Sequence, residues 1–223
     1  MDKRRKLDDL ERGRDLSRIL AFTDGVFAIA ATLLVLQIDV PSGVDSASAL
    51  WDGITEQGGD LWAYLFSFLV IGFFWIHHHR FMREVAEFDR GLMLINLVYL
   101  VFVVLIPFTS QVIGEYGDYP VAVTLYAINM SLVSLAFAWI QRHSLVRGLV
   151  ADGYEWDAEL SYKSSLFSSA YFLVAIPLSL LVGSWALLSW FGMRFDPFQK
   201  ERDRVYENAR RQAAPTPGSG DRG

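Results

Sequence analysis

The chain has 223 residues, of which 52% are hydrophobic and 14% aromatic, and its formal net charge is −5. This apolar share is too high for an ordinary soluble domain and is typical of a small polytopic membrane protein. The absence of cysteine excludes disulfides, zinc–thiolate sites and thiol nucleophiles. The first seventeen residues carry many charges of both signs and lack the pattern of a cleavable signal peptide, so the first apolar segment is expected to stay in the protein.

Apolar stretches long enough to cross hydrocarbon, which takes about 20 residues, follow one another along the chain. Four of them predict membrane-spanning helices, at 18–40, 60–79, 91–113 and 119–141. A fifth stretch, 164–195, would make a helix of about 48 Å, which is too long for one crossing and short for two. The tail that follows begins as a charged, helix-compatible segment and ends in a linker-like sequence that is expected to be disordered.

The positions of the 20 Lys and Arg residues decide the number of crossings. They lie before residue 19, within 80–90, within 142–163 and from 194 onward, whereas the loops after the first and third predicted helices carry only acidic charge. By the positive-inside rule the basic segments are cytoplasmic. Two cytoplasmic termini require an even number of crossings, so 164–195 is predicted to be a helical hairpin that turns around Gly183. The predicted fold class is an all-α membrane protein with six transmembrane helices and cytoplasmic N- and C-termini.

On a helical wheel, the first predicted helix shows two neighbouring stripes. The bulky apolar stripe consists of Phe22, Val26, Ile29, Leu33, Leu36 and Val40. The stripe of small and polar residues consists of Ala21, Gly25, Ala28, Thr32 and Asp39. Small residues let helices approach closely in lipid, so the simplest interpretation has the bulky stripe facing lipid and the small stripe packing on another helix.

The same helix opens with a motif that contains a charge. Arg18-Ile-Leu-Ala-Phe22-Thr23-Asp24, followed by GVFAIAATLLVLQI, resembles the signature at the start of the first helix of the transmembrane protein 175 potassium channels. That signature is arginine, three residues, then phenylalanine, serine and aspartate. Thr23 stands in place of the serine and keeps its hydroxyl group.

Two further matches lie downstream, and the resemblance covers most of residues 18–195. Trp75 with His78 or His77 and Phe81 resembles the end of the family's second helix. Asn96 with Pro107-Phe108 resembles its third helix.

The resemblance implies a potassium-selective ion channel and not an enzyme. A single motif with six spans is similar to the bacterial form, which assembles as a homotetramer around a central pore. The chain would then consist of a charged cytoplasmic N-terminus (1–17), a six-helix channel domain (18–195) and a cytoplasmic tail (196–223). Its partners would be copies of itself, the lipid bilayer of the plasma (inner) membrane and permeant potassium ions, with no cofactor, metal site or nucleic acid.

By position, the resemblance implies a pore lined by the first helix. Its narrowest ring falls on Ile29, further rings fall on Leu33 and Leu36, and the hydroxyl layer associated with potassium selectivity falls on Thr32. The chain has no TVGYG loop, so an ion at this hydrophobic constriction would lose water without gaining carbonyl ligands. Potassium holds its water less tightly than sodium, and we therefore expect modest selectivity for potassium.

The motif residues Arg18, Phe22, Thr23 and Asp24 are expected to form a structural network at the cytoplasmic end of the first helix. Their candidate partners on the second and third helices are His77, His78 and Asn96. Asp24 also lies near the helix N-terminus, where the helix dipole favours negative charge. The alternative role for Asp24 is direct binding of the permeant ion.

The three consecutive histidines 77–79 do not predict a metal site, because neighbouring residues on a helix point about 100° apart and do not converge on one ion. A proton-coupled or cation transporter is the alternative function. Transporters usually show acids within the membrane, broken helices and internal repeats. Apart from Asp24 and two prolines within the spans, this chain lacks those features.

Overall fold

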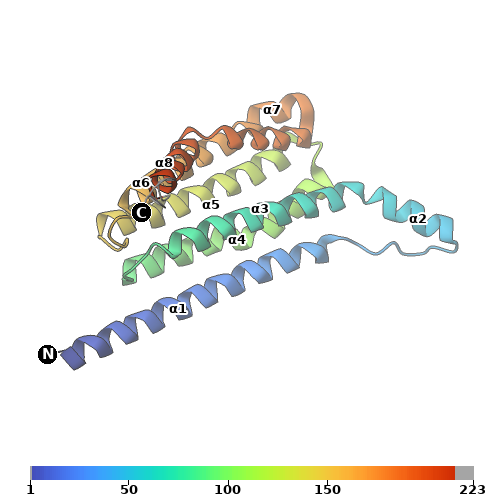
Figure 1. Cartoon of the computed structure of the whole chain (residues 1–223). Helices are drawn as coiled ribbons and strands as arrows, with labels where there is room; N and C mark the ends of the chain where they lie inside the picture. The colour runs from blue at the N-terminus through green and yellow to red at the C-terminus, as the bar shows by residue number, and fades with distance from the viewer. Residues whose placement is uncertain (1, 214–223) are drawn as a thin grey trace, which may run out of the picture.

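Helices make up nearly all of the described part of the protein, which comprises residues 2–213 of this computed structural model (Figure 1). In chain order the elements are α1 (Asp2–Leu33), the 3₁₀ helix η1 (Leu34–Gln37), α2 (Ala47–Glu56), α3 (Gly58–Met82), α4 (Arg90–Tyr116), α5 (Pro120–Val146), α6 (Glu155–Phe172), α7 (Ala175–Val182), the 3₁₀ helix η2 (Gly183–Phe195) and α8 (Pro197–Ala213). The linker-like end that is expected to be disordered lies mostly outside the described residues.

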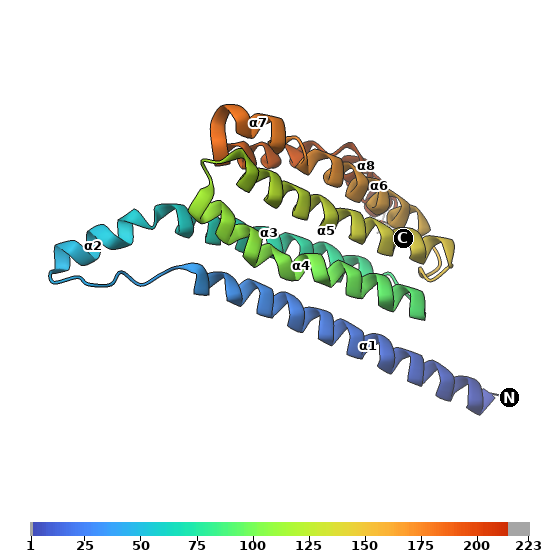
Figure 2. The ribbon, with the colours of Figure 1, turned by 180° about the vertical axis from the view of Figure 1, so that it is seen from behind.

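The long helices run side by side in one bundle, with α1 along one flank and α6, α7 and α8 along the other (Figure 1). The N-terminus, the α3–α4 and α5–α6 connections and the end of α8 lie toward one end of the bundle in both views (Figure 2). The α2 helix, the α4–α5 connection and the turn after α7 lie toward the opposite end. We call these the N-terminal end and the α2 end of the bundle.

The second, third and fourth predicted helices are confirmed as α3, α4 and α5, each a few residues longer than predicted. Two starts have clear local causes. The Asp89 side chain caps α4 by accepting a hydrogen bond from the Leu92 N–H at 2.7 Å. Pro120 occupies the first turn of α5, where its missing N–H costs nothing.

The first helix and the connection after it differ from the prediction. α1 begins at Asp2 rather than at residue 18, because the charged segment before the apolar run is rich in good helix formers. The connection 41–59, expected as a loop, contains α2, whose first turn is capped by the Ser46 hydroxyl accepting from the Ala49 N–H at 3.1 Å. Both figures show α2 projecting past the bundle.

The predicted hairpin is confirmed, but it begins at Glu155 rather than at residue 164. The helix breaks between α6 and α7, since Pro177 offers no N–H to the Leu173 carbonyl one turn earlier. The chain reverses at Gly183, whose φ of +57° suits glycine. η2 then returns along α6, where the Trp190 indole N–H donates to the Phe172 carbonyl at 3.1 Å.

Because η2 is a 3₁₀ helix, the second half of the hairpin extends further along the bundle than an α-helix with the same number of residues. The 13 residues of η2, at about 2.0 Å each, extend about 26 Å, against about 20 Å for an α-helix and about 30 Å for the hydrocarbon layer. Within residues 2–213, five helical segments are long and apolar enough to cross a membrane, and the last contains the whole hairpin: Leu16–Gln37, Gly58–Met82, Arg90–Tyr116, Pro120–Val146 and Glu155–Val205.

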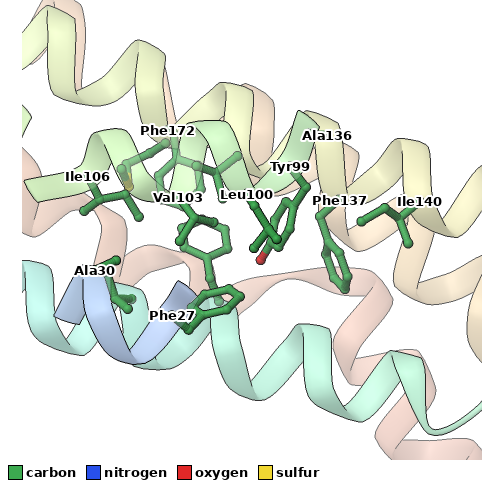
Figure 3. Packing of buried hydrophobic residues seen from close by; sticks show 14 of the residues in the cluster. Phe27, Ala30, Tyr99, Leu100, Val103, Ile106, Ala136, Phe137, Ile140 and Phe172 are labelled. Carbon is green, nitrogen blue, oxygen red and sulfur yellow. The ribbon is translucent and has the colours of Figure 1, made fainter. Parts of the chain in front are cut away.

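The core lies around α4 and α5. Tyr99, Val103 and Ile106 of α4 and Met130 and Ile140 of α5 are fully buried. Figure 3 shows Phe27 and Ala30 of α1 reaching toward this cluster from the neighbouring helix. α1 therefore contributes one edge of the core and leaves the rest of its surface outside.

Candidate functional site

Three buried polar side chains join α1 to α3 and α4. The Asn96 amide N–H donates to the Thr23 hydroxyl at 2.9 Å, and the Asn96 amide oxygen lies 2.9 Å from His78 Nε2. Because an amide oxygen only accepts, His78 Nε2 must donate. All three residues are at most 1% exposed. The structure thus brings together Thr23, His78 and Asn96 of the expected network, with Asn96 of α4 at their centre.

Aromatic rings surround this network. His78 stacks on Tyr99 with their centroids 5.3 Å apart, and Phe27 of α1 lies 6.0 Å from Tyr99. Figure 3 shows Phe27 and Tyr99 facing each other between the helices, with Phe137 of α5 beside them. Rings that exclude water strengthen the enclosed hydrogen bonds and raise the cost of leaving one unmade.

Asp24 has a partner that the sequence did not predict. The Trp75 indole N–H donates to Asp24 Oδ1 at 2.9 Å. In the sequence, Trp75 marks only the resemblance at the end of the second helix. The bond gives α1 a second attachment, to α3, one residue after its attachment to α4.

Arg18 and Phe22 lie beside the network rather than within it. Both are exposed, and both line a cavity of about 570 Å³ with Asn96 and with Asp89 at the start of α4. Within the described residues, Asp24 is bonded to Trp75, so the expected contact between Arg18 and Asp24 is replaced by this arrangement.

The prediction that His77 contacts the motif residues of α1 is wrong. Its Nδ1 bonds to the Phe73 carbonyl at 2.8 Å, and its ring lines a cavity of about 360 Å³ with Ser164 and Asp196, away from α1. His79 instead stacks on Trp75. The three neighbouring histidines therefore meet three different partners, as the spacing on a helix requires.

The proposed pore residues all lie on the outer side of α1 and of η1, which continues it. Ile29, Leu33 and Leu36 are 59%, 41% and 75% exposed, and Thr32 is exposed as well. The Thr32 hydroxyl donates to the Ile29 carbonyl at 2.9 Å. The face of α1 that contacts the bundle is a different one, made by Thr23, Phe27, Ala30 and Leu34.

The small stripe is exposed too. Ala21, Gly25 and Ala28 are exposed, and a side chain at Gly25 would meet no atom within 4 Å. These residues therefore do not pack on another helix within the described part of their own subunit. In the described part of one subunit, most residues of the two stripes are exposed, whereas Val26 of the bulky stripe packs against the core.

Gln37 provides a further attachment at the α2 end. Its side-chain amide donates to the Pro107 carbonyl of α4. The sequence analysis did not single out this residue, although a lone amide at the end of an apolar run is a recognisable signal. α1 is thus bonded to the bundle near both ends of its membrane-spanning part.

Comparison with known proteins identifies the group to which this architecture belongs. Residues 18–107 match the family described as endosomal/lysosomal potassium channel TMEM175. A potassium channel of Streptomyces collinus is 40% identical over 139 residues, which are 60% of this chain and 67% of that protein. A potassium channel of Chamaesiphon minutus is 34% identical over 182 residues, which are 75% of this chain and 85% of that protein. The chain belongs to the TMEM175 family.

A solved structure agrees with the TMEM175 assignment. The crystal structure of a homologue of the lysosomal potassium-selective channel TMEM175, from Chamaesiphon minutus, has a TM-score of 0.68 at 30% identity and covers 86% of this chain and 98% of its own. This protein therefore belongs to a family of ion channels and is an all-helical, multi-pass integral membrane protein.

The TMEM175 match also encloses the site. Residues 18–107 include α1 from the motif onward, all of α3 and most of α4. The network residues Thr23, His78 and Asn96 and the bonded pair Asp24 and Trp75 all fall inside it. The part of the chain that carries the family likeness is thus the part that attaches α1 to the bundle.

Proposed function

We propose that this protein is a homotetrameric potassium channel whose pore is lined by α1 of each subunit. The observation that supports this most directly is the position of Ile29, Leu33 and Leu36, which lie exposed on a helix whose opposite face is fixed to its own subunit. Such a stripe needs either lipid or a pore beside it. The resemblance to the family favours the pore.

The two exposed stripes have separate uses in this proposal. With about 100° per residue, Gly25, Ala28 and Thr32 lie on one flank of the exposed face, and Ile29 and Leu33 lie on the other. A helix in a ring presents one flank to the axis and the next to its neighbour. Small residues on that second flank allow close approach of a neighbouring α1 in lipid.

The proposed constriction is a ring of Ile29 side chains, followed by rings of Leu33 and Leu36. Because the rings offer no oxygen ligands, a cation must give up part of its hydration shell to pass, which favours potassium modestly over sodium. The same rings gate by dewetting when the pore narrows. We assign the layer of hydroxyl oxygens to Thr32, which lies on the flank next to the Ile29 stripe, beside the constriction rather than within its rings; its O–H donates to the Ile29 carbonyl and its lone pairs remain available.

We further propose six crossings, with both termini at the cytoplasmic face of the plasma membrane. The basic residues Arg80, Arg83, Arg142 and Arg147 lie at or near the helix ends that point to the N-terminal end of the bundle, as the positive-inside rule requires of the cytoplasmic side. In this arrangement residues 1–17 and 196–223 flank the channel domain 18–195. The first of these segments continues as a helix into α1.

The test is ion flux from liposomes that contain the pure protein, loaded with either potassium or sodium. We expect faster efflux of potassium than of sodium from wild type. Ile29→Asn should raise both fluxes and lower the potassium-to-sodium ratio severalfold, because an amide ring wets more easily and offers sodium the ligands it lacked.

The matched control is Val35→Asn, which places an amide at another exposed position of the same segment, away from the Ile29 stripe. It should leave the ratio close to wild type. If Val35→Asn alters selectivity and Ile29→Asn does not, the pore stripe is misplaced. Discrete single-channel current steps separate a channel from the alternative transporter, which would show none.

A further inference from the structure

A second cluster of charged residues lies at the N-terminal end of the bundle, far along the chain from the motif. Glu84 follows α3, Asp157 lies in the first turn of α6 and Arg202 lies on α8. Their exposed fractions are 8%, 0% and 7%, so three ionisable groups from three segments are buried together. The potassium pathway proposed above uses none of them.

Arg202 connects α8 to α6. Its Nη1 donates to the Ser161 hydroxyl at 2.6 Å, and its Nε lies 3.5 Å from Asp157 Oδ1. The other described attachment of α8 is at its start, where Asp196 accepts from Ser164 and from the Phe198 N–H. Arg202 is thus the contact that holds the second turn of α8 against the bundle.

The two acids of the cluster face each other. The Glu84 carboxyl group lies close enough to Asp157 for the two to interact directly. Glu84 Oε2 and both Asp157 oxygens are buried and have no hydrogen-bond partner in the described part of the chain. Two ionised carboxylates cannot hydrogen-bond to each other and repel strongly at low dielectric. A hydrogen bond between them therefore requires a proton on one of them.

Charge balance leads to the same requirement. With both acids ionised, the three buried groups Glu84, Asp157 and Arg202 carry a net negative charge, which is costly in a buried place and which Arg80, being exposed to solvent, only partly offsets. One proton makes the three groups neutral together. Arg80 of α3 lies beside Glu84 and favours its ionised form, His77 is further along the same small cavity of about 30 Å³, and Gln141 of α5 is uncharged.

Burial and the neighbouring Asp157 outweigh the two arginines. Burial, then the hydrogen bond and charge of Asp157, raise the pKa of Glu84 from 4.5 to about 8, against the opposing effect of Arg80 and Arg202. Glu84 lies in the connection after α3, outside the membrane-spanning segments.

We propose that Glu84 and Asp157 together bind one proton, and that this proton fixes α8 to the bundle through Arg202. When it is bound, neutral Glu84 donates to Asp157, and Asp157 remains the anion that pairs with Arg202. When the proton leaves to water, the Glu84 carboxylate repels Asp157 and competes for Arg202. The arginine contact then loosens, and α8 stays attached through Asp196 alone.

The test uses full-length protein in lipid nanodiscs and two measurements across pH 8. Infrared difference spectra between wild type and Glu84→Gln should contain a protonated-carboxyl C=O band that disappears as pH rises through about 8. Hydrogen exchange of the α8 amides, corrected for the intrinsic effect of pH, should rise severalfold over the same range in wild type. In Glu84→Gln, whose amide mimics the protonated acid, α8 should stay protected at alkaline pH.

Two more variants complete the design. Glu87→Gln changes an exposed acid of the same connection and should behave as wild type. Asp157→Asn removes the other acid, so Glu84 should ionise against Arg202 and the band should be lost. The proposal is overturned if the spectrum of Glu84→Gln itself still contains the protonated-carboxyl band. It is also overturned if the α8 amides of wild type exchange hydrogen equally fast on both sides of pH 8. Neither outcome bears on ion flux through α1, so this test is independent of the proposed pore.

Discussion

α1 and α5 both contain segments that are apolar and long enough to cross a membrane, yet the subunit buries them to different extents. In their most apolar windows, 61% of residues are buried in α5 and 22% in α1. Hydrophobic side chains gain little by leaving lipid for a protein interior, so an apolar sequence does not by itself predict burial within the subunit. The less buried helix is the one with surface available for other subunits and for ions.

The two helices are also held by different forces. α5 is packed on many sides, with residues such as Met130 and Ile140 fully buried. The described hydrogen bonds that attach α1 and η1 to the bundle run in both directions. Asn96 donates to Thr23 and Trp75 donates to Asp24, whereas Gln37 of η1 donates to the Pro107 carbonyl. A helix held by a few bonds on one edge can be detached without unfolding the rest.

The largest expected effect is in α5. Met130→Ala should lower the free energy of unfolding by about 2–5 kcal/mol, because the methionine is fully buried and leaves a cavity. Leu36→Ala, on the exposed side of η1, should change it by less than about 0.5 kcal/mol. Thermal unfolding of the solubilised protein measures both. Equal losses would show that the assembled protein buries the two helices alike.

An intermediate effect is expected where α1 meets α4. Asn96→Leu leaves the buried Thr23 hydroxyl and His78 without partners, at a cost of about 1–3 kcal/mol, and should lower the yield of assembled oligomer measured by size-exclusion chromatography. Thr23→Ser keeps the accepting hydroxyl and should assemble normally. Normal assembly of Asn96→Leu would mean that the aromatic contacts alone hold α1.

The smallest effect is expected at Asp24. Asp24→Ala and Trp75→Phe each remove the same hydrogen bond, so each should cost about 1 kcal/mol, and the double variant should cost less than their sum. Asp24→Asn keeps an accepting oxygen and should be near wild type in stability. If Asp24→Asn assembles normally yet conducts poorly, the charge of Asp24 acts on the ion directly.

Much of the fold was predictable because lipid imposes strong rules on sequence. Apolar runs and the positions of basic residues gave three helices closely and placed the reversal at Gly183. α2 and the first turns of α6 were missed, since both have mixed composition and lie next to loops. The helical character of residues 2–17 is not predicted by hydropathy, because charged residues end the apolar segment without ending the helix.

The site was predictable only in part, because sequence does not specify how helices are rotated against each other. Thr23, His78 and Asn96 were expected to meet and do. The choice between His77 and His78 depends on the rotation of α3 by one residue. The bond between Trp75 and Asp24 depends on the same rotation, and no motif signals it.

Backbone hydrogen bonds, which we call the backbone clasp, join the α3–α4 connection to the α5–α6 connection at the N-terminal end of the bundle. The Ala86 N–H donates to the Leu149 carbonyl at 2.8 Å, and the Ala151 N–H donates to the Glu84 carbonyl at 2.8 Å, around the bridge between Val85 and Val150. Main-chain bonds survive most substitutions, so this clasp fixes the depths of α3 and α5 against each other whatever their side chains become. The hairpins α3–α4 and α5–α6 are therefore joined at both ends, by these backbone bonds at the N-terminal end and by the short α4–α5 connection at the α2 end.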